Sequence, residues 1–125
     1  MRTSRPLKKV VIMVNQGDII WLDLDTKVGH EMRGRHPVLV VSNQRYNRVS
    51  NLSIICPIAD KDNSHDHHIR LDKRTKTQGF VLTDQARILD IVAHNYEFIE
   101  RIPHEILFDV TDIISEFFKK ENETI

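Results

Sequence analysis

Two clusters of basic side chains are the parts of this sequence best suited to bind a polyanion. The first cluster, residues 45–48, reads Arg-Tyr-Asn-Arg and places an aromatic ring between two guanidinium groups. Single-stranded RNA is commonly bound in this way, with a base stacked on the ring and cations on the phosphates. The second cluster, Lys73, Arg74 and Lys76, would extend such a phosphate track. The alternative for the first cluster is a surface turn in which Tyr46 packs inward.

Three histidines near the middle of the chain raise the question of a metal site. His65, His67 and His68 flank Asp66 in a polar segment. Zinc ligands must converge on one point, and adjacent residues on a loop seldom do so. We therefore interpret this segment as a solvated loop and expect no metal.

Composition sets the size and class of the protein. The chain has 125 residues, of which 40% are apolar, and it carries 18 basic and 18 acidic residues. This length corresponds to one domain with its own core, which we place at residues 17–120, between an N-terminal arm (1–16) and a tail (121–125). The single cysteine, Cys56, excludes a disulfide framework and is expected to be a small buried strand residue. No apolar run is long enough for a signal peptide or a membrane span, so we expect a cytoplasmic protein.

The balanced net charge hides an uneven distribution along the chain. Residues 26–50 contain five basic residues and one acidic residue, whereas residues 97–125 contain three basic and eight acidic residues. Such asymmetry is typical of a protein with one surface that faces a polyanion. An ordinary solvated face is the alternative interpretation.

Short strands account for most of the pattern between residues 18 and 92. Alternating or continuous β-branched runs predict strands at residues 18–25, 37–41, 52–58, 68–71, 79–82 and 86–92, and residues 10–14 could pair as an edge strand. The connecting segments are polar. We expect a long loop at residues 26–36, a turn at 43–51 and a loop at 60–68.

One amphipathic helix is expected at the C-terminal end of the domain. Apolar residues recur at three- and four-residue steps over residues 106–118. Pro103 stands where the first turn would begin, and Lys119 and Lys120 would close the last turn. A shorter helical turn is compatible with residues 93–100. Several short strands followed by one helix predict a mainly β protein, a small antiparallel barrel or half-open sheet that the helix closes on one side.

Three segments together resemble one known family. They contain GDIIW, GHE and PVLVVS within residues 17–42, CPIA at residues 56–59, and GFVLTDQ at residues 79–85, followed by Arg87. In this order and spacing they resemble the MazF/PemK family of toxin endoribonucleases, also called mRNA interferases, over residues 17–118.

The resemblance implies a fold, an activity and a set of partners. The fold is a small SH3-like antiparallel β-barrel, the cell-growth-inhibitor plug fold of CcdB and PemK, with a C-terminal amphipathic helix. The members are homodimers that cleave single-stranded RNA without a metal or other cofactor. The ribose 2′-hydroxyl attacks the adjacent phosphate and leaves a 2′,3′-cyclic phosphate. Members are paired with an antitoxin, and their contact with DNA is indirect, through that antitoxin.

The resemblance also locates the candidate catalytic residues, and the sequence departs from the family pattern at two of them. The family has an Arg before the proline of the PVLV strand and a Thr or Ser two residues after the proline of the next strand. Here these positions hold His36 and Ala59. Arg35 is one residue earlier, where an extended backbone points it to the opposite face. Glu31 and Asp84 match a loop glutamate and an aspartate that assist in some members.

Three outcomes are open at this site. In the first, His36 is the general acid or base, since histidine exchanges protons near neutral pH. Arg33, Arg35 or Arg87 would then stabilise the charge on the phosphate. In the second, Arg35 turns into the site and His36 is secondary. In the third, His36 and Ala59 mark an inactive toxin fold that still binds RNA or an antitoxin.

Further residues are expected to contact RNA or an interface. The predicted RNA-binding side chains belong to loops and connectors and are His30, Arg33, Arg45, Arg48, Arg87, Lys73 and Arg74. Trp21 is expected in the core or a dimer interface, and Phe117 and Phe118 in core or dimer packing. Besides an endoribonuclease and a non-catalytic binding module, a gyrase-directed poison of the same fold is a third function class.

Overall fold

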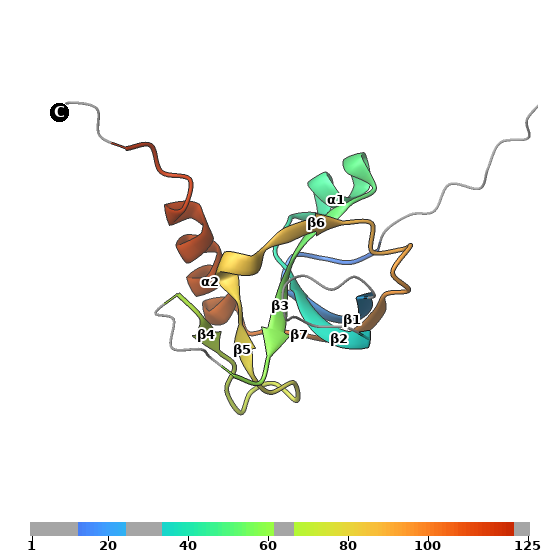
Figure 1. The fold of residues 1–125 in the computed structure, drawn as a ribbon, viewed down its shortest axis with the longest axis horizontal. Helices are drawn as coiled ribbons and strands as arrows, with labels where there is room; N and C mark the ends of the chain where they lie inside the picture. The colour runs from blue at the N-terminus through green and yellow to red at the C-terminus, as the bar shows by residue number, and fades with distance from the viewer. Residues whose placement is uncertain (1–12, 25–33, 62–66, 122–125) are drawn as a thin grey trace, which may run out of the picture.

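The computed structural model of the chain describes residues 13–24, 34–61 and 67–121 (Figure 1). Its elements follow the chain in this order: β1 (Asp18–Leu24), β2 (Gly34–Val40), α1 (Gln44–Ser50), β3 (Ser53–Ala59), β4 (Ile69–Arg70), β5 (Phe80–Val81), the 3-10 turn η1 (Thr83–Gln85), β6 (Arg87–Leu89), β7 (Glu97–Arg101) and α2 (His104–Glu116). The strands expected at 18–25, 52–58, 68–71, 79–82 and 86–92 are thus confirmed, with bounds that differ by one to three residues, as is the C-terminal helix.

The described strands form one curved antiparallel sheet with α2 beside it. Its order is β4-β5-β3-β2-β1-β7, and β6 pairs with the first half of β3. Strand β3 crosses the middle of the molecule, with α1 next to its start and the β4–β5 pair next to its end (Figure 1). This half-barrel with a C-terminal helix is the fold class that the sequence predicted.

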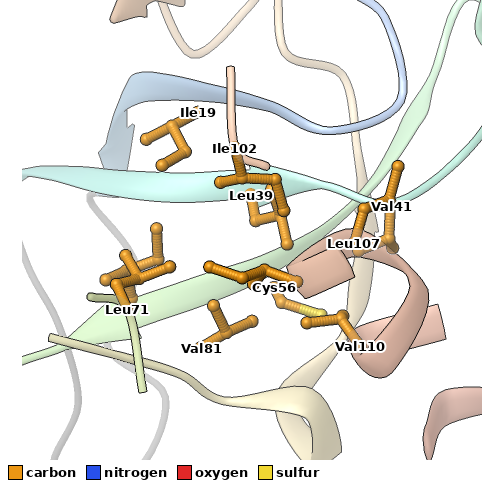
Figure 2. Packing of buried hydrophobic residues seen from close by; sticks show 11 residues of the cluster. Ile19, Leu39, Val41, Cys56, Leu71, Val81, Ile102, Leu107 and Val110 are labelled. Atoms are coloured by element: carbon orange, nitrogen blue, oxygen red, sulfur yellow. The ribbon is translucent and has the colours of Figure 1, made fainter. Parts of the chain in front are cut away.

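Both faces of the sheet are buried, because alternate residues of the central strands enter two different cores. On β1, Ile19 belongs to one core, whereas Ile20 and Leu22 belong to the other. The first core is sandwiched between the sheet and α2, and Figure 2 shows Cys56 at its centre next to Val110. The second core contains Val14, Ile20, Leu22, Leu24, Val38, Val40, Ile55 and Ile91.

Helix α2 is anchored by its predicted apolar stripe. Ile106, Leu107 and Val110 are buried against the sheet, and burying each such side chain contributes about 1.5–3 kcal/mol. The helix is shorter than expected: it ends at Glu116, so Lys119 and Lys120 lie beyond its last turn. Phe117 and Phe118 are also beyond it and are exposed, so these two rings are not in the core, and the alternative of dimer packing stays a prediction.

Strand β2 begins three residues before its predicted start at Pro37. Residues 34–37 pair with β1 alone, whereas pairing with β3 starts at Val38, opposite Pro57. Pro37 therefore sits where one side of β2 has no neighbouring strand, and the missing N–H of proline leaves no gap in the sheet. As a consequence, Arg35 and His36 are strand residues and not part of a loop.

Residues 44–50 form a helix where the sequence suggested a turn. The side chain of Asn43 accepts a hydrogen bond from the backbone N–H of Tyr46 at 2.8 Å and caps the first turn. Asn51 ends the helix in a left-handed conformation with φ of 62°. Only Asn47 of this helix is buried, so the apolar stripe that normally reveals a helix is missing.

Two further predictions concern segments beside β1 and β7. The helical turn that the sequence allowed at residues 93–100 is wrong for residues 97–100, which belong to strand β7 and pair with β1. Of the possible edge strand at residues 10–14, residues 10–12 lie outside the described residues, and Met13 and Val14 are not in a strand. Val14 is nevertheless buried in the second core.

Candidate active site

A pocket of about 600 Å³ opens where β2 begins and β3 ends. Its lining residues come from β1, β2, β3, β7 and the connection between β4 and β5: Trp21, Arg35, His36, Pro37, Ile58, Ala59, Asp60, Lys76, Thr77, Gln78 and Ile99. Most of the wall is thus built from strands that pack in the two cores. The connection between β4 and β5 supplies the rest through residues 76–78.

The two positions at which the sequence departs from the family pattern meet in this pocket. Val38 pairs with Pro57 and Leu39 with Cys56. Continuing this antiparallel register by two residues places His36 opposite Ala59, and both line the pocket. The imidazole of a half-buried histidine and a methyl group therefore occupy the region where the family resemblance implies a guanidinium and a hydroxyl.

Arg35 also lines the pocket, but two carboxylates compensate its charge. Its guanidinium donates to Asp23 at 2.9 Å and to Glu97 at 2.7 Å, and to the backbone carbonyl of Asn95 at 3.3 Å. The hydrogen bonds to Glu97 and then Asp23 hold the pKa of Arg35 above its usual value. Hydrogen bonds from Asn95 and then Arg35 hold the pKa of Asp23 below its usual value. One cation and two anions leave this group of side chains with a net charge of −1, which does not attract a phosphate.

The loop side of the pocket is fixed to the sheet by Glu100 of β7. Its carboxylate accepts the backbone N–H of Lys76 at 3.0 Å, and the N–H and hydroxyl of Thr77 at 2.8 and 2.7 Å. Burial raises the pKa of Glu100, but these hydrogen bonds outweigh it and the pKa lies below its usual value. Glu100, Thr77 and the pocket position of Trp21 were missed by sequence reasoning, because only the fold brings these distant residues together.

Asp84 belongs to a different group of side chains. It lies in η1, and its Oδ1 is hydrogen-bonded to Nε2 of the buried His68 imidazole at 2.9 Å. The hydroxyl of neighbouring Thr83 donates to the carbonyl of His67 at 2.7 Å. Asp84 does not line the pocket of His36, and these contacts attach residues 67–68 to η1.

The cysteine next to this group is inert, as the sequence indicated. Cys56 is fully buried in the first core (Figure 2). Burial, with a smaller contribution from the negative charge of Asp84, raises the pKa of its thiol to about 12. The thiolate is therefore almost absent at neutral pH, and Cys56 is not a nucleophile.

The predicted RNA-binding residues are divided among several surfaces. Lys73 and Arg74 line a second pocket of about 620 Å³, which shares Gln78 with the first and therefore adjoins it. The guanidinium of Arg74 is paired there with Asp72 at 2.8 Å and Glu105 at 2.7 Å.

The remaining predicted RNA-binding residues lie away from the pocket or outside the described part of the chain. Arg45 and Arg48 lie on α1, near the start of β3, and Arg87 pairs with Ile55 in the first half of β3. Neither α1 nor β6 lines the His36 pocket. His30, Glu31 and Arg33 fall outside the described residues.

Within residues 13–24, 34–61 and 67–121, no group of three or more His, Cys, Asp or Glu side chains is placed to hold a metal ion. His65 and Asp66 fall outside these ranges. In the same part of the chain, no helix has the length and apolar character needed to cross a membrane.

Comparison with known proteins agrees with the fold and the motifs. Residues 15–118 match the model of the PemK-like, MazF-like toxins of type II toxin–antitoxin systems. The endoribonuclease PemK of Escherichia coli is 32% identical over 106 residues, which cover 82% of this chain and 80% of PemK. The endoribonuclease EndoA of Bacillus subtilis is 31% identical over 84 residues, covering 63% and 72% of the two chains. The crystal structure of MazF from Deinococcus radiodurans superimposes with a TM-score of 0.76 at 28% identity, over 84% of this chain and 96% of MazF. A MazE–MazF structure from the same organism gives a TM-score of 0.74 at 25% identity, over 86% and 97% of the chains. This chain therefore belongs to the PemK-like, MazF-like family of type II toxins.

Proposed function

We propose that this toxin is a metal-independent endoribonuclease that cleaves single-stranded RNA in the His36 pocket. The proposal is supported by its relatives PemK and EndoA, which are named endoribonucleases. The observation that carries it is that His36 and Lys76 line one pocket. An imidazole and a cation in one pocket are the two kinds of group that phosphodiester cleavage requires.

The proposed reaction is an internal transfer at phosphorus. The ribose 2′-hydroxyl loses its proton and its oxygen attacks the adjacent phosphate, while the bond from phosphorus to the 5′-oxygen breaks. The leaving oxygen takes up a proton, so the products are a 2′,3′-cyclic phosphate and a 5′-hydroxyl. His36 accepts the proton of the 2′-hydroxyl or donates the proton to the leaving 5′-oxygen, and water serves at the other position, because His36 lines the pocket and histidine is suited to proton transfer near neutral pH.

Cleavage of a long single-stranded RNA in EDTA tests this proposal. Replacing His36 by Ala should lower the single-turnover rate by about 100- to 10,000-fold, the usual contribution of general acid–base catalysis. His104→Ala is the matched control, since His104 is an exposed histidine at the start of α2 and does not line the pocket. Equal rates for the wild-type protein and His36→Ala would contradict the assignment.

The alternative function is a non-catalytic toxin fold that binds RNA or an antitoxin. Two observations favour it: Ala59 supplies no hydroxyl, and the charge of Arg35 is compensated by carboxylates. On this account the wild-type protein cuts no RNA in EDTA, whereas the double variant His36→Arg, Ala59→Thr does. Cleavage by the wild-type protein rules the alternative out.

We also propose that the protein acts in the cytoplasm as a homodimer whose partner is an antitoxin. The structural neighbour solved as a MazE–MazF complex supports the antitoxin partner. Exposed aromatic rings such as Phe98, Phe108 and Phe118 offer apolar surface to partner chains. Light scattering of the purified protein should give twice the mass of one chain, and a monomer at micromolar concentration would contradict the dimer.

A further inference from the structure

Two permanent cations line the pocket in the part of the chain that the structure describes, Arg35 and Lys76, and their electrostatic surroundings differ. Arg35 is paired with the carboxylates of Asp23 and Glu97, and these three side chains together carry a net charge of −1. Lys76 is exposed at the opposite, loop side of the pocket. Its positive charge helps to lower the pKa of Glu100, and Asp60 lines the same pocket, but among the described residues no ion pair holds the ammonium group of Lys76. Lys76 is thus the cation of this pocket whose charge is available to a phosphate.

The backbone at Lys76 is held in place more firmly than its exposure suggests. The carboxylate of Glu100 accepts three hydrogen bonds from Lys76 and Thr77, at 2.7–3.0 Å. Just before them, the buried Thr75 closes the turn: its hydroxyl lies 2.7 Å from the carbonyl of Thr77 and 3.2 Å from that of Asp72. Glu100 itself is part of β7 and pairs with Ile19 of β1. The sheet therefore fixes the point from which the Lys76 side chain extends along the pocket.

We propose that Lys76 is the phosphate-binding cation of this toxin and that Glu100 is the residue that positions it. In this arrangement the ammonium group stabilises the negative charge that grows on the phosphate oxygens as the 2′-oxygen attacks. The position of the family's arginine is occupied by His36 in this chain, and Lys76 supplies the positive charge instead. Lysine acts as a point charge and does not bind two oxygens at once, so it needs the fixed loop to be aimed at the phosphate. This inference rests on the proposed RNA-binding function of the pocket.

The test uses two RNA substrates, four single variants and one double variant. One oligonucleotide is cleavable; the other is the same sequence with 2′-O-methyl groups, which removes the attacking hydroxyl and reports binding alone. Lys76→Met should lower the single-turnover rate in EDTA by about 100-fold, as for removal of one group that stabilises transition-state charge. It should also reduce, by about one, the slope of log binding affinity against log salt concentration, because about one counterion fewer is released on binding. Lys76→Arg should recover most of both, because it restores the charge.

Lys120→Met is the matched control, since Lys120 is an exposed lysine beyond α2 that lines neither pocket. It should leave the cleavage rate close to that of the wild-type protein. Glu100→Gln should slow cleavage, and combining it with Lys76→Met should add no further loss. This non-additivity is the result expected if Glu100 acts through Lys76, whereas a merely structural effect would add to it.

Each outcome decides either the inference or the function on which it rests. If the wild-type protein binds the methylated RNA but cleaves nothing, the endoribonuclease proposal fails, and weaker binding by Lys76→Met still supports the phosphate contact. If Lys76→Met and Lys120→Met behave alike in rate and binding, the inference is overturned. It is also overturned if the wild-type protein does not bind RNA, or if Lys76→Arg behaves like Lys76→Met.

Discussion

Replacing Gly79 by Ala perturbs the contact between β5 and the strand that carries Ala59. Gly79 has a φ of 123°, a conformation that residues with a side chain rarely adopt. A Cβ at this position would lie 2.5 Å from the carbonyl oxygen of Ala59 and 3.1 Å from its carbonyl carbon. Both atoms belong to the backbone of β3, so no side chain can turn away to relieve the overlap.

The expected loss of stability has two parts, the cost of the backbone conformation and the displacement of Gly79 that relieves the overlap. An unfavourable backbone conformation costs about 1–3 kcal/mol. Moving Gly79 away from Ala59 also weakens the hydrogen bond that the Leu71 N–H donates to the carbonyl of Gly79 at 2.8 Å, which adds about 1 kcal/mol. The sum, about 2–4 kcal/mol, should lower the Tm by about 8–16 °C, at about 4 °C per kcal/mol for a domain of this size.

Gly34→Ala is the control that isolates the backbone effect. Gly34 has a φ of 80°, but no described atom lies within 4 Å of a Cβ built there. Its substitution should cost about 1–2 kcal/mol, or about 4–8 °C in Tm. Thermal unfolding followed by far-UV circular dichroism measures both variants. The reasoning is refuted if Gly79→Ala unfolds at the wild-type temperature or is no less stable than Gly34→Ala.

Two other predictions concern titrating groups. Burial raises the pKa of Cys56 to about 12. A thiol reagent at pH 8 should therefore label the folded protein far more slowly than the unfolded protein. Equal labelling rates would contradict burial of this thiol. Hydrogen bonds from Arg74 hold the pKa of Asp72 at about 2, below the ordinary value of 3.8. A carboxyl group with a lowered pKa stabilises the folded state at pH values above its ordinary pKa. This stabilisation is lost as the pH falls through the lowered pKa of the folded state. Arg74 also holds the pKa of Glu105 below its ordinary value of 4.5. The Tm of Arg74→Met should therefore lie slightly below that of the wild-type protein at neutral pH, and the gap should narrow as the pH falls from 4.5 to about 2. A gap that persists unchanged at pH 2 would count against the ion pairs.

Elements with a strong apolar pattern could be predicted from the sequence. The alternation around Ile20 and Leu22 predicts β1, and the stripe through Ile106 and Val110 predicts α2, because each pattern reflects a face that must be buried. Helix α1 lacks such a face, since only Asn47 is buried and the caps at Asn43 and Asn51 define its ends. Polar composition alone made these residues resemble a turn.

The candidate site was predictable only where motif and strand coincide. His36 and Ala59 were located by the motifs around Pro37 and Pro57, and the register of β2 and β3 brings them to one pocket. Glu100 could not be assigned, because it acts on Lys76 and Thr77, more than twenty positions earlier, through contacts that only the folded sheet creates. The compensation of Arg35 by Asp23 and Glu97 depends on tertiary pairing in the same way.

The identity of the ends of the RNA fragments is the most direct test of the proposed activity. A synthetic RNA containing a cleavage site is incubated with the protein in EDTA, and the fragments are weighed by mass spectrometry. We expect one fragment to end in a 2′,3′-cyclic phosphate and the other to begin with a 5′-hydroxyl. A single 2′-deoxy substitution at the cleaved nucleotide should abolish the reaction, since it removes the attacking oxygen. Fragments with a 3′-hydroxyl and a 5′-phosphate, or cleavage of the deoxy-substituted RNA, would contradict attack by the 2′-hydroxyl in the His36 pocket.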